Sequence, residues 1–235
     1  MGRKRKQTED DGQRDLMPVH LSMPHKLRHE KRLIIVLENA QLETVKVGQD
    51  FALLNPDDHI HILHRMGRDA STCRPDITHQ CLMMLLDSPL NRAGLLQVYV
   101  HTSKNVLIEV HPQTRIPRTF KRFAGLMVQL LHKLSVKAQD RGIKLMKIIK
   151  NPVSDHLPAG CPKYSTSCGA TDVRKASQCV PEGEDPVVFV IGAMAHGKLE
   201  MDYTEGEIAI GNYPLSAALT CTKLCSAFED AWEVL

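Results

Sequence analysis

Basic residues crowd the start of one predicted helix. Arg118, Lys121 and Arg122 lie at the N-terminal end of an apolar pattern with helical spacing, which begins between residues 117 and 119. Cations are unfavourable at this end of a helix, because the helix dipole places partial positive charge there. Anions are attracted to the same place, and clustered arginines bind phosphate through paired hydrogen bonds. The pattern therefore predicts a phosphate-binding site.

The charge of the surrounding segment leads to the same prediction. Residues 111–150 contain ten Lys and Arg residues and one acidic residue, a net charge of +9 in a chain whose total is +3. A solvated helix face is the simpler alternative, but such faces usually mix both signs of charge. Charge this concentrated favours a polyanion such as RNA or DNA as the partner.

Three predicted strands in the last third of the chain end in loops that contain glycine or proline. The loops are residues 151–152, 192–197 and 211–215. Ligands of open parallel sheets bind at the carboxyl ends of the strands, and glycine lets the backbone approach a flat ligand closely. We therefore expect a small-molecule site formed by these loops. Their glycines do not have the GxGxxG spacing of a dinucleotide site.

Two groups of potential metal ligands lack the spacing of a metal site. His59 and His61 would share one face of an extended segment, but no Cys or carboxylate follows at ligand spacing, so we expect surface histidines. The loop-rich segment 154–185 contains four more candidates, His156, Cys161, Cys168 and Cys179. These lack the CxxC pair that is typical of zinc sites, and we predict no metal.

Hydrophobic periodicity predicts an α/β fold. The apolar runs at residues 32–39 and 185–192 are typical of buried strands in a parallel sheet. Further strands are predicted at residues 95–100, 106–110, 143–152 and 207–211, with residues 101–105 as the turn between the first two.

Three helices are predicted between and after these strands. Pro75 fits the first turn of the first helix, which ends at residues 88–89. The second is the basic helix, and Gly142 is its expected C-cap. Ser216 caps the third. This last helix carries an apolar stripe of Ala218, Cys221, Cys225, Phe228 and Trp232, widened by Leu224, Ala227 and Leu235.

The composition is that of a soluble globular protein, with 43% hydrophobic and 24% charged residues. No apolar run approaches the ~20 residues that span a bilayer, so we expect no membrane association. Seven Cys without regular spacing favour reduced thiols, in the cytosol or nucleus. Residues 1–30 predict a disordered tail of mixed charge, in which RKRK at positions 3–6 is either a nuclear address or part of a solvated tail.

Five motifs, taken in order, resemble one enzyme family: RPDITHQ, RIPRTFKRF, IKNPVSDHLP, IGAMAHG and NYPLSAALTCTKLC. From about residue 32 to the C-terminus the sequence is similar to the Nep/Emg family of ribosome-biogenesis methyltransferases, which methylate N1 of a pseudouridine in small-subunit rRNA. That family belongs to the SPOUT superfamily. The resemblance implies a mostly parallel sheet with helices on both faces and a C-terminal trefoil knot, which holds S-adenosylmethionine. It also implies that residues 31–235 form a single domain.

The resemblance further implies the residues of the cofactor site. They are Thr166, Gly192, Gly197, Ile210, Gly211, Asn212, Tyr213, Pro214 and Leu215. Backbone groups of these loops would read the edges of the adenine, and Ile210 and Leu215 would sandwich its ring.

Four arginines correspond to residues that contact rRNA in the family: Arg74, Arg115, Arg118 and Arg122. Asp76 corresponds to a residue that orients Arg74, and it is the one acid beside the arginine motifs and therefore a candidate catalytic group. A carboxylate at a hydrophilic helix start stays ionised on the helix dipole, which favours an orienting role over that of a general base.

The resemblance implies a homodimer, with the stripe of the final helix serving both core and interface. It implies small-subunit rRNA and ribosome assembly factors as partners, in the nucleus and nucleolus. One alternative is a non-catalytic rRNA-binding assembly factor without a working cofactor pocket. Another is a small-molecule-binding α/β protein whose basic helix contacts only protein.

Overall fold

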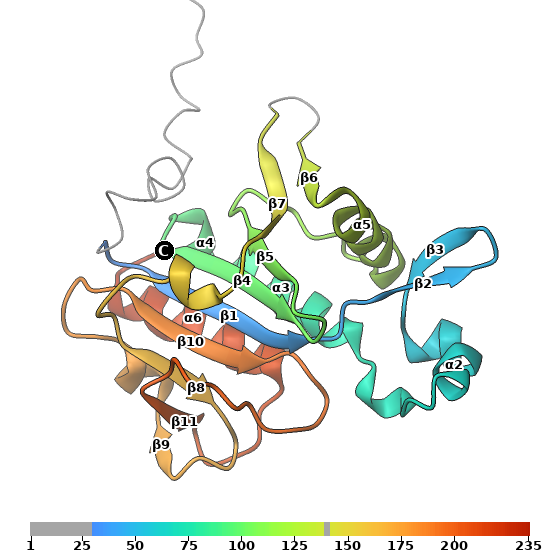
Figure 1. The fold of residues 1–235 in the computed structure, drawn as a ribbon. Helices are drawn as coiled ribbons and strands as arrows, with labels where there is room; N and C mark the ends of the chain where they lie inside the picture. Colours follow the sequence, from blue (N-terminus) through green and yellow to red (C-terminus); the bar gives the residue numbers. More distant parts are fainter. Residues whose placement is uncertain (1–29, 139–141) are drawn as a thin grey trace, which may run out of the picture.

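The computed structural model describes residues 30–138 and 142–235 (Figure 1). In this part of the chain a nine-stranded sheet has the order β6-β7-β5-β4-β1-β10-β8-β11-β9. These strands are, in that order, Ser135–Lys137, Lys144–Ile149, Leu107–Val110, Leu96–Thr102, Leu33–Ala40, Val187–Gly192, Lys163–Thr166, Gly206–Ile210 and Asp172–Arg174. The α-helices are α2 (Pro56–Arg65), α3 (Pro75–Asp87), α4 (Pro89–Arg92), α5 (Phe120–Lys133) and α6 (Ala217–Ala231).

The sheet is parallel over most of its width. β1 pairs in parallel with β4 on one side and β10 on the other, and the parallel pairing continues through β8 and β11 to β9. β5, β7 and β6 extend the other side by antiparallel pairing. β1 is almost wholly buried, as its continuous apolar sequence predicts for a central strand covered on both faces. The predicted mostly parallel α/β sheet is confirmed.

The α-helices that cover this sheet lie on one face. α3, α5 and α6 bury their apolar sides against the strands in a large core around Phe123, Phe189 and Phe228. The opposite face carries a smaller core, which the 3-10 helix η3 (Val153–His156) and residues 199–203 cover. Helices were predicted for both faces, but in the described sheet the α-helices cover one face and only the short 3-10 helix η3 lies on the other. The segments that reach the other face are short and lack helical periodicity.

Helix α5 begins where its sequence predicts and ends earlier. Thr119 is its N-cap, but the helix ends at Lys133, and Leu134 adopts a left-handed conformation with φ 61°. Val136 in the following strand β6 is buried against the same core, paired with β7. The predicted C-cap at Gly142 is therefore wrong, because strand pairing takes residues 135–137 out of the helix.

A projecting unit between β1 and α3 was not predicted. β2 (Thr44–Val47) and β3 (Asp50–Leu53) form an antiparallel hairpin, and α2 packs nearby over the short 3-10 helix η2 (Ala70–Thr72) (Figure 1). His59 lies in α2, where it is 8% exposed and its Nδ1 accepts a hydrogen bond from the backbone of Asn55. The expectation of an extended segment with surface histidines is wrong for His59, whereas His61 is exposed.

The stripe of α6 packs inside its own chain. Cys221, Cys225 and Phe228 are buried, and the Phe228 ring lies 6.2 Å from Phe189 and 4.8 Å from Trp232, measured between centroids. These side chains are core residues and are not available to a second copy, so this part of the expected interface is wrong. The trefoil knot and the single domain over residues 31–235 stay predictions. The predicted tail, residues 1–30, lies outside the described residues except for its last position.

The helices in the described ranges are too short or too polar for any of them to cross a membrane.

Candidate cofactor pocket and RNA-binding surface

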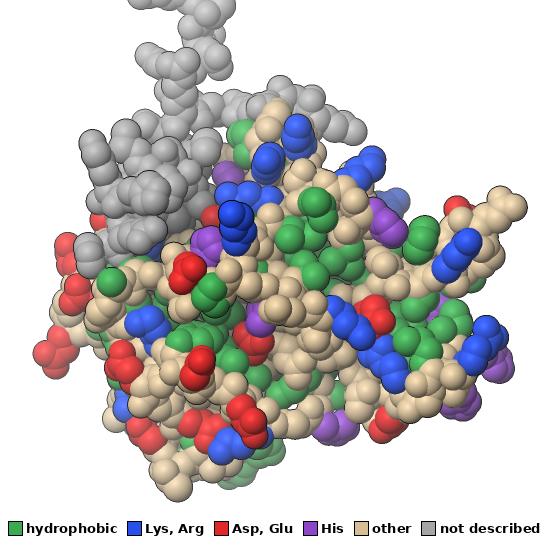
Figure 2. All heavy atoms as spheres, viewed as in Figure 1, with side chains coloured by type: hydrophobic (Ala, Val, Ile, Leu, Met, Phe, Trp, Pro, Cys, Tyr) green, Lys and Arg blue, Asp and Glu red, His purple; other side chains and the backbone are tan. Residues whose placement is uncertain are grey.

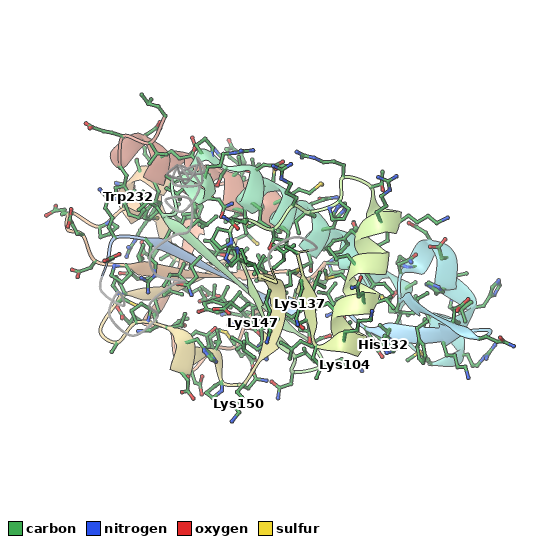
Figure 3. All side chains as sticks on the ribbon, turned by 90° about the horizontal axis from the view of Figure 1, so that it is seen from above. Lys104, His132, Lys137, Lys147, Lys150 and Trp232 are labelled. Carbon is green, nitrogen blue, oxygen red and sulfur yellow. The ribbon has the colours of Figure 1, made fainter. Side chains whose placement is uncertain are left out.

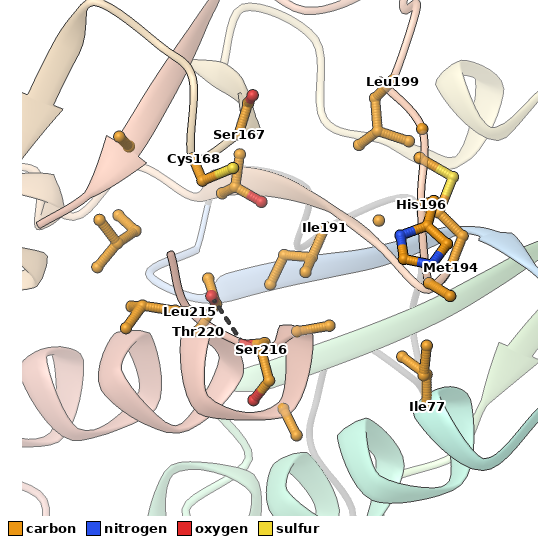
Figure 4. Close-up of a pocket in the computed structure, with 18 of the residues that line it drawn as sticks. Ile77, Ser167, Cys168, Ile191, Met194, His196, Leu199, Leu215, Ser216 and Thr220 are labelled. Carbon is orange, nitrogen blue, oxygen red and sulfur yellow. Dashed lines mark hydrogen bonds between the residues drawn. The ribbon is translucent and has the colours of Figure 1, made fainter. Parts of the chain in front are cut away.

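A pocket of about 440 Å³ lies at the carboxyl ends of β8, β10 and β11 (Figure 4). The start of α6 and one side of α3 form the remaining wall of the pocket. Of the residues predicted to hold the cofactor, seven line it: Thr166, Gly192, Gly197, Ile210, Gly211, Tyr213 and Leu215. Asn212 and Pro214 belong to the same loop as Tyr213, but they are exposed and do not line the pocket. The structure thus brings together residues that are up to 49 positions apart in sequence, from Thr166 to Leu215.

One of the three predicted strand ends lies elsewhere. Residues 151–152 follow β7, which is antiparallel to its neighbours and lies on the far side of β1 from the pocket. The end of β8 takes that place, with Thr166, Ser167 and Cys168 lining the pocket. β8 was not predicted, because it is a strand of only four residues within the segment that sequence analysis assigned to loops.

Two glycines permit the backbone geometry of the pocket loops. Gly197 has φ 117°, and a Cβ atom there would lie 3.5 Å from the Cε and Sδ atoms of Met194. Gly211 has φ 82°, and its N–H donates to the carbonyl oxygen of Arg174 at 2.9 Å. Residues with a side chain rarely adopt such φ values. The glycine pattern in the sequence therefore marks real turns at the pocket.

The pocket combines apolar walls with polar groups at its edges. Ile191, Ile210 and Leu215 supply apolar surface, while Ser167 and Gln80 supply polar side chains. The volume lies in the usual range of small-ligand sites, about 300–1,000 Å³. This arrangement suits a flat ring whose edges form hydrogen bonds, as in a nucleoside.

Helix α3 contributes a side of the pocket that sequence analysis missed. Arg74, Ile77 and Gln80 all line it, and their spacing of three residues places them along one face of the helix. That spacing is visible in the sequence, but it indicates a ligand only once α3 is known to lie against the pocket. Arg74, predicted as an RNA contact, therefore borders the cofactor pocket as well.

Arg74 is held by Asp76 in a bidentate ion pair. Nε of Arg74 donates to Oδ1 of Asp76 at 2.8 Å, and Nη2 donates to Oδ2 at 2.6 Å. These hydrogen bonds from Arg74 lower the pKa of Asp76, against the opposing effect of burial. The carboxylate therefore stays ionised at neutral pH. Its geometry is the one that an orienting role requires, and its lowered pKa is unfavourable for a general base.

The other three arginines lie on the surface around the start of α5. Arg115, Arg118 and Arg122 are exposed, and Arg118 forms an ion pair with Asp87 at the end of α3. The first turn of α5 has no acidic residue, and its N-cap side chain makes no hydrogen bond to the helix. The backbone N–H groups at the start of α5 thus donate no hydrogen bond to the N-cap side chain. Together with the arginines, they make this helix end suited to binding a phosphate.

A buried histidine fixes this surface relative to Arg74. His79 of α3 hydrogen-bonds the carbonyl oxygen of Pro117 through Nε2 at 2.7 Å, and its ring stacks on Phe123 with centroids 4.5 Å apart. Because His79 and Arg74 lie on the same helix within two turns, the arginine surface and the pocket both border α3. The predicted RNA contacts and cofactor contacts thus adjoin each other.

The four residues weighed as zinc ligands are dispersed. Cys161 and Cys179 are buried in the cores on opposite faces of the sheet, while Cys168 is exposed at the pocket. His156 hydrogen-bonds the carbonyl oxygen of Lys150. Within the described ranges, no group of three or more His, Cys, Asp or Glu side chains is placed to hold a metal ion.

The model of one protein family, described as EMG1/NEP1 methyltransferase, matches residues 35–229. The chain belongs to this family. It is 57% identical to the "Ribosomal RNA small subunit methyltransferase NEP1" of Drosophila melanogaster, over 100% of this chain and 97% of that protein. It is 65% identical to the Homo sapiens protein of the same name, over 87% of this chain and 84% of that one.

A solved structure shares the fold. It is the Archaeoglobus fulgidus Nep1 bound to S-adenosylhomocysteine, with a TM-score of 0.71 and 24% sequence identity, covering 87% of this chain and 99% of that one. This chain and that Nep1 therefore share one fold over most of their length.

Proposed function

We propose that this chain transfers a methyl group from S-adenosylmethionine to small-subunit rRNA, at N1 of a pseudouridine. The observation that carries the proposal is the position of Arg74, which lines the pocket and whose guanidinium is held by Asp76 in a bidentate ion pair. A cofactor pocket and an RNA-binding surface meet at this residue. Relatives 57% and 65% identical are named small-subunit rRNA methyltransferases, which supports the substrate class.

The pocket residues fit S-adenosylmethionine. Ile210 and Leu215 supply apolar surface for the adenine ring, and the positive φ of Gly197 and Gly211 shapes backbone turns close to it. The Nep1 neighbour was crystallised with S-adenosylhomocysteine, the demethylated product of such a cofactor. When bound, S-adenosylmethionine supplies an electrophilic methyl group on a sulfonium. The loops would align it and exclude water, which accounts for much of the rate of such a displacement.

The arginines would bind the RNA and prepare its base. Arg115, Arg118 and Arg122 would contact phosphates, which offsets the few kcal/mol that flipping a base out of its stack costs. Arg74 at the pocket edge places a positive charge where N1 of the base would lie, and this favours the anion that forms when the N1–H proton leaves to solvent. Asp76 holds that guanidinium in place, so it is a positioning residue.

Single-turnover transfer of a labelled methyl group tests the proposal. The substrates are two synthetic small-subunit rRNA stem-loops that differ only in pseudouridine or uridine at one position. We expect transfer to the pseudouridine form alone. Tight RNA binding without transfer would support the non-catalytic assembly factor, and equal transfer to both forms would contradict specificity for N1 of pseudouridine.

We also propose a homodimer that uses the outer sides of α3 and α6. These helices pack against each other, and each exposes a large apolar residue, Met84 at 40% and Leu219 at 44%. Leu219→Arg should leave the fold intact and weaken the dimer, as measured by sedimentation. Phe228→Glu should instead unfold the chain, because it would place a charge in the core. A wild-type chain that sediments as a monomer at high concentration would contradict the dimer.

The proposed substrate also suggests a place in the cell. A protein that modifies small-subunit rRNA during ribosome biogenesis would act in the nucleus and nucleolus, together with other assembly factors. A fluorescent fusion of the full chain should therefore concentrate in nucleoli, and uniform cytosolic fluorescence would contradict this part of the proposal.

A further inference from the structure

A second basic surface lies at the antiparallel end of the sheet, away from the cofactor pocket. We call it the lysine surface, and it consists of Lys104, Lys137, Lys144, Lys147 and Lys150. Lys104 lies between β4 and β5, Lys137 is on β6, and Lys150 follows β7. Lys144 and Lys147 are on β7, where their spacing of three positions places their side chains on opposite faces of the strand, so the lysine surface wraps around this end of the sheet. Figure 3 labels four of these lysines, which lie around β6, β7 and the β4–β5 turn, and Figure 2 shows basic side chains gathered over β6 and β7.

Few acidic groups neutralise this surface. Lys147 forms an ion pair with Glu109. Lys104 lies 3.6 Å from Glu43, which also pairs with Arg68 at 2.6 Å.

The other three members are exposed: Lys137, Lys144 and Lys150. In the described part of the chain, none of them has a carboxylate within ion-pair distance. The surface therefore keeps a net positive charge after its internal pairs are counted.

Two of the unpaired lysines face each other across a strand pair. Lys137 of β6 is the partner of Lys144 of β7, at a point where the register of the antiparallel pair shifts. Like charges directly opposite each other destabilise such a pair. Such an unfavourable charge pair is often found at a binding site. A bound polyanion would remove the repulsion between the two lysines.

An exposed aromatic pair lies at the end of α5 next to this region. Phe51 of the β2–β3 hairpin is 50% exposed, and its ring centroid lies 4.5 Å from that of His132. His132 is exposed too, two positions before Leu134, whose carbonyl oxygen accepts from Ile148 of β7. Exposed rings beside lysines are the combination that binds single-stranded nucleic acid, because bases stack on the rings while cations hold the backbone.

The lysine surface is distinct from the arginine surface around the start of α5. The two lie at opposite ends of this helix, whose 14 residues span about 21 Å at 1.5 Å per residue. One RNA strand that is bound at the arginines can therefore reach the lysines only if it continues for several nucleotides beyond its first contacts.

We propose that the lysine surface binds the backbone of a single-stranded rRNA segment that continues from the segment held at the arginines. The inference rests on the proposed function, since it takes the rRNA substrate as the ligand. It adds a second contact region, which would hold flanking RNA and raise affinity without touching the modified base.

The test uses two RNA probes and one pair of matched variants. Both probes share the pseudouridine stem-loop, and one of them continues into an oligouridylate tail. The test variant is Lys137→Gln/Lys150→Gln. The control is Arg92→Gln/Lys175→Gln, which removes the same charge from exposed basic residues elsewhere on the chain. Equilibrium binding is measured over a series of salt concentrations, alongside single-turnover methylation of the short probe.

We expect the wild-type chain to bind the tailed probe more tightly and with a steeper salt dependence than the short one. The test variant should lose this difference, with a slope lower by about 1.4 units for two lost phosphate contacts on a single strand, and should methylate the short probe normally. If the test variant binds the tailed probe like the control, the inference is wrong, and an acidic protein becomes the better partner. Failure of the wild-type chain to methylate the short probe would instead contradict the proposed function.

Discussion

Replacing Asp76 by glycine should weaken both the fold and the RNA site. The carboxylate makes a bidentate pair with Arg74 and lies in the first turn of α3, where a negative charge is favourable. Glycine removes the pair and the charge, and it also frees the backbone at the helix start. Asparagine at the same position keeps a hydrogen-bonding side chain and removes only the charge.

The structure sets the size of the effect. The side chains of Arg74 and Asp76 are 43% and 32% exposed, so solvent screens their ion pair. An exposed pair contributes about 0.2–1 kcal/mol and the helix dipole about 0.3–1 kcal/mol. Adding the lower helix propensity of glycine, we expect Asp76→Gly to lower the free energy of unfolding by about 1–2 kcal/mol and Asp76→Asn by about half of that.

The RNA affinity should fall for a separate reason. Fixing the conformation of a long side chain on binding costs about 0.5–1.5 kcal/mol. Asp76 already fixes the Arg74 side chain in the RNA-free protein, so wild type avoids this cost. Loss of Asp76 should therefore raise the Kd for RNA by about two- to tenfold in both variants. Affinity for S-adenosylmethionine should change less, because Asp76 itself does not line the pocket.

Urea unfolding and RNA titration of the two variants check these values. The pH dependence of the free energy of unfolding gives a further control. The folded-state pKa of Asp76 is lowered, so its stabilising effect should be present above the unfolded-state value of about 3.9 and disappear as the pH falls through the folded-state value. The stability difference between wild type and Asp76→Asn should therefore shrink in acid. Normal RNA affinity together with complete loss of single-turnover methylation in Asp76→Asn would refute this reasoning and make Asp76 the base.

Three other predictions follow from single features. Gly197→Leu should abolish cofactor binding in calorimetry, whereas Gly160→Leu, at another positive φ outside the pocket, should not; equal affinity in both variants would place the cofactor elsewhere. Alanine at Arg115, Arg118 or Arg122 should lower the salt slope of RNA binding by about one unit each, and Arg92→Ala should leave it unchanged. The hydrogen bond to Glu38 raises the pKa of His101, so His101 should stabilise the fold below about pH 6.5 and less as the pH rises through its folded-state pKa. The check is urea unfolding of wild type and His101→Gln in acid and in alkali. If the two midpoints differ by the same amount at both pH values, His101 does not stabilise the fold through its raised pKa.

Much of the fold could be predicted because local signals agree with the tertiary structure. The buried strands β1 and β10 are continuous apolar runs, and α3 and α6 begin at Pro75 and after the Ser216 cap as predicted. The end of α5 was missed because pairing between β6 and β7 overrides the helical pattern. The one-sided helix layer was missed for a similar reason, since the choice of face depends on contacts between distant segments.

The candidate site was predictable where glycine spacing or clustered charge marks it. The loops around Gly197 and Gly211 were found in this way, as was the arginine surface. The contributions of Ile77, Gln80 and the end of β8 could not be found, because their positions at the pocket depend on how α3 and β8 pack in the folded chain.

Nucleoside mass spectrometry of the reaction product tests the central claim most directly. The purified chain is incubated with S-adenosylmethionine and the pseudouridine stem-loop, and the RNA is then digested to nucleosides. We expect one added methyl group on N1 of pseudouridine and a loss of this product in Gly197→Leu. An unmodified pseudouridine, in a reaction where both the cofactor and the RNA are shown to be bound, would contradict it.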